Sequence, residues 1–160
     1  MIKKKREHTM KTAIIYHSAH HQNTKQLVDA ICQTYAVDAF EVPGAQNIPV
    51  SSYDLIGFAS GIYMSRFHKS LFELVEEYRE DLRGKSAFLL FTSGSGNASY
   101  QASFAQALAE CGCKVRSFYQ CRGFDTFGPW KLIGGIAKNH PNEDDIKGAL
   151  AFYESCIMQK

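Results

Sequence analysis

Short apolar runs alternate along the chain with segments of helical period. The apolar runs predict strands at residues 12–17, 37–42, 54–60, 86–93 and 114–120. The runs at 12–17 and 86–93 are apolar without alternation, as in central parallel strands covered on both faces, whereas 37–42 alternates like an edge strand. Strands that alternate with helices pack as one sheet between two helical layers, so the pattern predicts an α/β, doubly wound fold with five parallel strands.

Four segments between and after these strands have the spacing of amphipathic helices. The first begins after "NTK" and carries Leu27, Val28 and Ile31 on one face, and the second runs over about 71–82. The third, over about 99–111, is expected to end at Gly112. The last is expected to begin after Asn142, because an Asn cap followed by three acidic residues suits the positive end of a helix dipole. Residues 43–52 predict only a loop.

Length and charge limit the classes of function. A chain of 160 residues fits one domain. Residues 1–9 carry a local charge of +3, which leaves fourteen basic against fifteen acidic residues in 10–160. We therefore expect a flexible basic leader at 1–9 and one nearly neutral domain at 10–160, with no nucleic-acid face. No apolar run approaches the roughly 18 residues that span a bilayer, and no secretory signal is evident, so we expect a cytoplasmic protein without a membrane partner. The odd number of cysteines, five, does not indicate a disulfide framework.

The loop "SAHHQNT", residues 18–24, is the first candidate for chemistry. In doubly wound sheets ligands bind beyond the carboxyl ends of the strands, and the amino end of a helix offers unpaired N–H groups to a phosphate. Asn23 or Thr24 would equally serve as an ordinary helix cap. His17, His20 and His21 also allow a metal site, although no acidic residue or cysteine lies nearby in sequence. A Ser–His nucleophile lacks the G-x-S-x-G context.

Two further loops predict a flat ligand. "ASGIYMSRFHKS" (59–70) places large apolar groups just beyond a strand, where they either contact a ligand or, as for Tyr63 and Phe67, pack under the next helix. Gly61 allows a positive φ or a close approach. "TSGSGNASY" (92–100) is small and polar and does not have P-loop spacing. A single phosphate-binding turn next to aromatic side chains indicates a mononucleotide with a flat ring, such as FMN. A dinucleotide is less suitable because the fingerprint G-x-G-x-x-G is missing from the first turn.

Three separated segments resemble the flavodoxin family: "IIYHSAHHQNT", "SGIYMSRFHKSL" and "GFDTFGPWKLIGGIAKNHPNEDD". The resemblance covers about residues 11–157 and implies a flavodoxin-like sheet in the strand order 2-1-3-4-5 with FMN as cofactor. It implies that the phosphate is held by Ser18, Ala19, His20, His21, Gln22, Asn23 and Thr24. It implies that the ring is bordered by Ser60, Gly61, Ile62, Tyr63, Thr92, Ser93, Gly94, Asn97, Tyr100, Phe124 and Phe127.

The sequence departs from the family pattern at informative places. The phosphate loop is one residue longer than usual and has Gln22 where the family carries Gly before Asn. The familiar stacking Trp is not in the second loop, so Tyr63 would take its role. Residues 10–160 are nearly neutral, whereas electron-transferring flavodoxins are often strongly acidic.

The resulting hypothesis is an FMN-binding electron-transfer protein that shuttles electrons between redox partner proteins by transient contact. One alternative is a small NAD(P)H-dependent FMN oxidoreductase acting on quinones or similar acceptors, with the long loop 122–141 as a substrate or partner platform. That loop would otherwise only cap the sheet. The other alternative is a flavin-free flavodoxin-fold interaction module.

Overall fold

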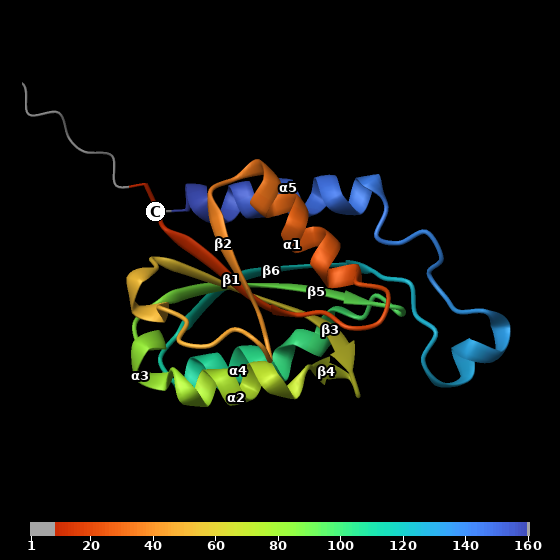
Figure 1. The fold of residues 1–160 in the computed structure, drawn as a ribbon, viewed down its shortest axis with the longest axis horizontal. Helices are drawn as coiled ribbons and strands as arrows, with labels where there is room; N and C mark the ends of the chain where they lie inside the picture. The colour runs from red at the N-terminus through yellow and green to blue at the C-terminus, as the bar shows by residue number, and fades with distance from the viewer. Residues whose placement is uncertain (1–8, 160) are drawn as a thin grey trace, which may run out of the picture.

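A computed structural model describes residues 9–159 as a parallel sheet between two helical layers (Figure 1). The elements are β1 (Thr12–His17), α1 (Asn23–Thr34), β2 (Val37–Glu41), η1 (Val50–Ser52), β3 (Leu55–Tyr63), β4 (Arg66–Phe67), α2 (Lys69–Glu77), α3 (Arg79–Leu82), β5 (Ser86–Ser93), η2 (Ala98–Gln101), α4 (Ala102–Glu110), β6 (Lys114–Arg122), η3 (Gly128–Ile133) and α5 (Glu143–Met158). The predicted leader at 1–9 lies outside the described residues except for Thr9, and it stays a prediction.

The sheet confirms the α/β doubly wound fold and its strand order. Its path is β2-β1-β3-β5-β6, which is 2-1-3-4-5 when the five parallel strands are numbered along the chain. The short strand β4 was not predicted, and it pairs antiparallel with the end of β3. Met64 and Ser65 close this hairpin at φ 51° and 62°, and β3 continues to Tyr63 rather than ending at residue 60. The hairpin therefore extends the sheet at the carboxyl end of β3.

The two faces of β1 enter different halves of the core. Ile14 and Tyr16 pack on the side covered by α1 and α5, and Ala13 and Ile15 pack on the side covered by α2, α3 and α4 (Figure 1). Both faces of a central strand are thus buried, which is the physical reason for its uninterrupted apolar sequence. The edge strand β2 has no fully buried residue: Val37 and Phe40 are partly buried and the other three residues are exposed, so its burial marks an edge position but does not alternate.

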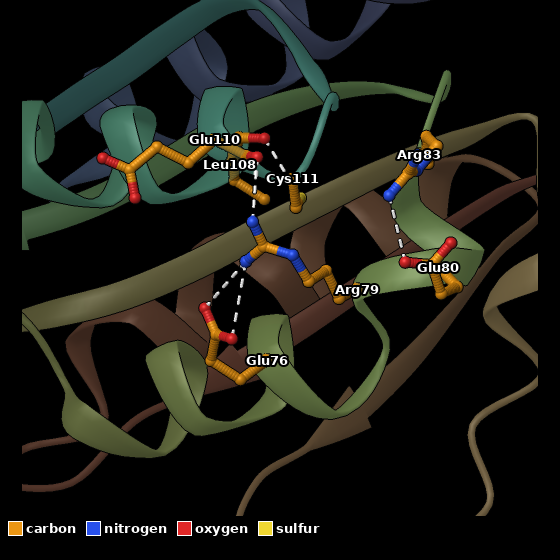
Figure 2. Close-up of polar contacts among 7 residues, drawn as sticks. All are labelled: Glu76, Arg79, Glu80, Arg83, Leu108, Glu110 and Cys111. Atoms are coloured by element: carbon orange, nitrogen blue, oxygen red, sulfur yellow. Dashed lines mark hydrogen bonds and ion pairs between the residues drawn. The ribbon is translucent and has the colours of Figure 1, made fainter.

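The predicted helix at 71–82 is instead two helices, α2 and α3, separated at Tyr78. Tyr78 has φ −101° and ψ 22°, and its hydroxyl accepts a hydrogen bond from the Ile48 N–H at 3.0 Å. Next to this break the Arg79 guanidinium donates to the Glu110 carbonyl at 3.0 Å and pairs with Glu76 at 3.2 Å (Figure 2). A cation beside the last carbonyls of α4 suits the negative end of its dipole. Tertiary contacts of Tyr78 and Arg79 thus accompany the break.

The amino end of α5 has the predicted cap. Asn142 Oδ1 accepts the Asp145 N–H at 3.0 Å, and Asp145 Oδ2 accepts the Asn142 N–H at 2.8 Å, which together form a capping box. The long segment between β6 and α5 extends beyond the end of the sheet in Figure 1. Across residues 9–159, each helix is too short or too polar to span a lipid bilayer.

Candidate functional site

A cleft of about 800 Å³ lies at the carboxyl ends of the strands, among the loops that follow β1, β3, β5 and β6. Its volume is in the range of small-molecule and cofactor sites. The predicted residues that line it are Ala19, His20, Asn23, Thr24, Gly61, Ile62, Tyr63, Thr92, Ser93, Gly94, Tyr100, Phe124 and Phe127. The structure therefore brings together residues from all four loops, and their role in binding remains a prediction.

Five predicted residues do not line the cleft. Ser18, Ser60 and Asn97 accept hydrogen bonds from the N–H groups of nearby residues, and His21 and Gln22 are exposed in the turn before α1. Several residues that line the cleft were not among the predicted cofactor-binding residues, although those after β6 fall in the loop 122–141 considered as a substrate or partner platform: Met64, Ser65, Ser95, Gly123, Asp125, Thr126, Gly128, Trp130 and Lys131. Most of these lie in the segment after β6. The rule that ligands bind beyond the carboxyl ends of strands points to that segment but not to single residues.

The turn between β1 and α1 has an uncommon backbone. Three consecutive residues, His20, His21 and Gln22, have φ of 38°, 58° and 54°. A non-glycine residue in this left-handed region costs roughly 1–2 kcal/mol, and such conformations persist where surrounding contacts over-determine them. Gln22, which stands where the family pattern has Gly, therefore adopts a positive φ that glycine would adopt without steric cost. Gly61, by contrast, is in extended β3 and does not use the positive φ that was considered for it.

The amides on either side of this turn are held by side chains. Lys25 N–H donates to Ser18 Oγ at 3.1 Å, and Ala19 N–H donates to the Tyr63 hydroxyl at 3.2 Å. Between them, the N–H groups of residues 20–24 make no well-aligned hydrogen bond within the described part of the chain. The beginning of α1 therefore offers unpaired donors beside the cleft.

Neither Asn23 nor Thr24 is the helix cap. The cap position is Gln22, whose side chain makes no capping bond, and the Ser18 hydroxyl takes over that function by accepting the Lys25 N–H. Asn23 Nδ2 instead donates to the Phe124 carbonyl at 2.8 Å, and Thr24 Oγ1 shares a buried hydrogen bond of 2.9 Å with Thr92 Oγ1. These two side chains tie the turn to the loops after β6 and β5.

The segment after β6 packs closely against the other loops. A Cβ on Gly123 would lie 2.7 Å from the Asn23 amide nitrogen, and a Cβ on Gly94 would lie 2.8 Å from the Asp125 Cβ. His21 Nε2 and Thr126 Oγ1 also share a hydrogen bond of 3.0 Å. The absence of a Cβ at these two glycines therefore leaves room for the side chains of Asn23 and Asp125.

Aromatic side chains form part of the cleft wall. Tyr63 and Tyr100 both line it, whereas Phe67 is fully buried and stacks on Phe104 with 4.9 Å between ring centroids. The alternative of packing under a helix is therefore correct for Phe67, and Tyr63 is at the cleft. Burial raises the pKa of the Tyr63 phenol, which the hydrogen bond from Ala19 partly offsets. The phenol is thus uncharged near neutral pH and presents an uncharged aromatic face.

The three histidines weighed as metal ligands have different surroundings. His17 Nδ1 donates to the Val42 carbonyl at 2.6 Å, and its ring stacks on His68. His20 lines the cleft, and the His21 ring packs against Phe124 with 4.3 Å between centroids. Over residues 9–159, no three His, Cys, Asp or Glu side chains are grouped closely enough to hold a metal ion.

Comparisons with known proteins identify the fold and the family. A family model described as a flavodoxin domain matches residues 13–119. An uncharacterized protein of Methanocaldococcus jannaschii is 35% identical over 150 residues, which cover 92% of this chain and 99% of the relative.

Solved structures are similar at lower identity. A flavodoxin, WrbA-like protein from Agrobacterium tumefaciens has a TM-score of 0.67 at 14% identity, over 93% of this chain and 96% of that one. A flavoprotein from Lactobacillus acidophilus, solved in complex with FMN, has a TM-score of 0.59 at 19% identity, over 69% of this chain and 93% of that one. At such identities these structures show the shared fold alone.

The left-handed turn predicts opposite effects of glycine at two glutamines. Gln22→Gly should raise the free energy of unfolding by about 0.5–1 kcal/mol, because glycine adopts the observed φ without the steric cost. The matched control Gln26→Gly, inside α1, should lower it by about 1 kcal/mol. Urea unfolding measures both, and a destabilised Gln22→Gly would contradict the left-handed assignment.

Proposed function

The chain belongs to the flavodoxin family, and from that premise we propose that it is a cytoplasmic, non-covalent FMN protein that carries electrons between redox partners. The observation that carries the proposal is the unpaired amide run at the start of α1, which adjoins a cleft with aromatic walls. An anion such as a phosphate would accept hydrogen bonds from the unpaired amides, and a planar ring would pack against the aromatic walls of the cleft.

The turn before α1 fits a phosphate. Residues 18–24 contain no carboxylate that would repel it, and they include the first two residues of α1, a helix of 12 residues whose positive dipole end lies at this turn. The nearest lysine in sequence, Lys25, is already paired with Asp29 at 2.6 Å. Backbone N–H groups, together with the His20 side chain at the cleft, would therefore be the main donors to the phosphate.

The rest of the cleft fits a flat heterocycle. Tyr63 and Tyr100 supply aromatic faces, and the small residues Thr92, Ser93 and Gly94 leave backbone groups accessible to ring heteroatoms. When bound, FMN supplies the redox chemistry, and the protein orients it and limits its contact with water.

Partner docking is proposed for the rim of the cleft. Met64 is 86% exposed on the β3–β4 hairpin, and the segment after β6 exposes Phe127 (71%), Leu132 (89%) and Ile133 (65%), with Trp130 half exposed beside them. Large apolar side chains at this exposure indicate an interaction surface. Residues 123–141 carry Lys131 and Lys138 against one carboxylate, Asp125. The rim therefore suits a partner with an apolar centre and acidic surroundings.

A second candidate function is an NAD(P)H-dependent FMN oxidoreductase. The observation in its favour is the extent of the cleft, whose lining reaches from Thr24 to Trp130 and Lys131. Stepwise reduction distinguishes the two functions. A carrier should take up its electrons in two separated steps and turn over NAD(P)H slowly, whereas fast NAD(P)H oxidation with a quinone would favour the enzyme.

The phosphate seat predicts a strong preference for FMN over riboflavin. Two or more charge-assisted hydrogen bonds from the turn should make FMN bind at least about 100-fold more tightly, which corresponds to ~2.7 kcal/mol. Titration with quenching of flavin fluorescence measures both ligands. Equal affinities for FMN and riboflavin would contradict phosphate binding by the turn before α1. If neither ligand binds, the alternative of a flavin-free interaction module is favoured.

The apolar rim predicts a selective loss of electron exchange with proteins. In the FMN-loaded chain, replacing both Trp130 and Leu132 by Ser should slow exchange with an acidic ferredoxin by about tenfold, because apolar contact area is lost. Reduction by dithionite, which needs no docking, should not change. The matched control Met158→Ser removes an exposed apolar side chain (75%) at the end of α5. An equal effect of the control would count against the rim.

A further inference from the structure

Two histidines from distant parts of the chain form a stacked pair behind Tyr63. The rings of His17, at the end of β1, and His68, before α2, are nearly parallel at 10° with 3.6 Å between centroids. Tyr63 meets both rings edge-on, at 5.5 Å from His17 and 4.9 Å from His68. Tyr63 in turn accepts the Ala19 N–H of the turn before α1. A continuous line of contacts therefore connects the pair to the turn.

The hydrogen bonds determine the proton positions on both rings. A carbonyl oxygen only accepts, so His17 Nδ1, which lies 2.6 Å from the Val42 carbonyl, carries a hydrogen. A backbone N–H only donates, so His68 Nδ1, which caps α2 by accepting the Ser70 N–H at 3.3 Å, carries none. His68 is therefore neutral in this structure, with its hydrogen on Nε2.

Protonation of His68 would remove this arrangement. The added proton goes to Nδ1, where it excludes the Ser70 N–H, while the Ser70 hydroxyl at 2.8 Å can reverse from donor to acceptor. The neighbouring His17 ring at the stacking distance also disfavours a positive charge on His68. We propose that the His17–His68 pair is a proton-sensitive support that positions Tyr63 against the turn before α1 and loosens when His68 is protonated.

The groups around the pair set the pH range. Burial lowers the pKa of His68, and the neighbouring His17 and Lys69 lower it further, while Glu73 on α2 opposes them. The Val42 carbonyl, directly after β2, contacts His17, and the Tyr63 ring at the end of β3 contacts both histidines. A histidine with a depressed pKa stabilises the fold fully above its ordinary value of about 6.5, and this contribution falls as the pH drops toward the folded-state pKa. The support should therefore hold at neutral pH and weaken in mild acid.

The test follows the Ala19 amide and the histidine rings by NMR in the flavin-free protein between pH 4.5 and 8. In the wild type the Ala19 amide shift should change with the same midpoint as His68, below 6.5. In His68→Asn, which keeps a capping side chain that does not titrate, that transition should vanish. In His17→Gln the His68 midpoint should rise. A constant Ala19 shift through the His68 titration, or an unchanged transition in His68→Asn, would overturn the proposal.

Two controls make the result specific. His140→Asn removes a histidine that pairs with Asp145 next to α5, and it should leave the Ala19 transition unchanged. Tyr63→Phe removes the acceptor of the Ala19 N–H and should leave His68 titrating while Ala19 no longer responds. Loss of the transition in His140→Asn would assign it to another histidine and contradict the proposal.

The consequence for cofactor binding rests on the proposed function and is measured separately. FMN should bind about threefold to tenfold more weakly at pH 5 than at pH 7.5 in the wild type, and this ratio should approach one in His68→Asn. Failure to bind FMN at any pH would refute the proposed function and leave the NMR result standing. Binding with the same pH ratio in both proteins would refute the link between the pair and the cofactor.

Discussion

The site depends on how the backbone N–H groups at the start of α1 are satisfied. A helix leaves its first amides without internal partners, and side-chain caps usually compensate for part of that loss. Here the residue at the cap position, Gln22, gives no side-chain cap, and the turn passes through three left-handed residues. Ser18 accepts one amide at the far side of the turn, and the amides of residues 20–24 make no well-aligned hydrogen bond within the described chain; His20, Asn23 and Thr24 of this run line the cleft. A turn that costs several kcal/mol and leaves donors free is typical of a binding site rather than of a connection.

Contacts from the other loops keep this turn in place. The Asn23 amide reaches the Phe124 carbonyl, Thr24 meets Thr92 in the interior, and Ala19 contacts Tyr63. Each contact comes from a different strand end of the parallel sheet. The strand order β2-β1-β3-β5-β6 places those ends along one edge, so the sheet topology assembles the site.

Tyr63 lines the cleft and also contacts the stacked histidine pair. It lines the cleft as an uncharged ring, and it is supported from behind by the stacked His17–His68 pair. The sheet does not end where its apolar sequence ends, because β3 continues to Tyr63 and pairs with β4. The same extension that presents Tyr63 to the cleft exposes Met64 at its rim. The β3–β4 hairpin thus contributes Tyr63 to the cleft and Met64 to its rim, and Tyr63 also contacts the stacked histidine pair.

The sequence alone determined the five parallel strands and most of the helices, but it did not indicate β4, the short helix η1 within the predicted loop 43–52, or the break between α2 and α3. Apolar runs without alternation gave β1 and β5 with their observed bounds, and Asn142 with its acidic neighbours gave the cap of α5, because these signals are local. It also located the strand-end loops and 13 of the residues that line the cleft. Tertiary structure decided the rest. Tyr78 interrupts a continuous helical pattern. Asn23 and Thr24 form hydrogen bonds with distant loops instead of capping α1. His17 stacks on His68, which is 51 positions away in the sequence. Such choices depend on partners that only the folded chain brings within reach, so no local pattern encodes them.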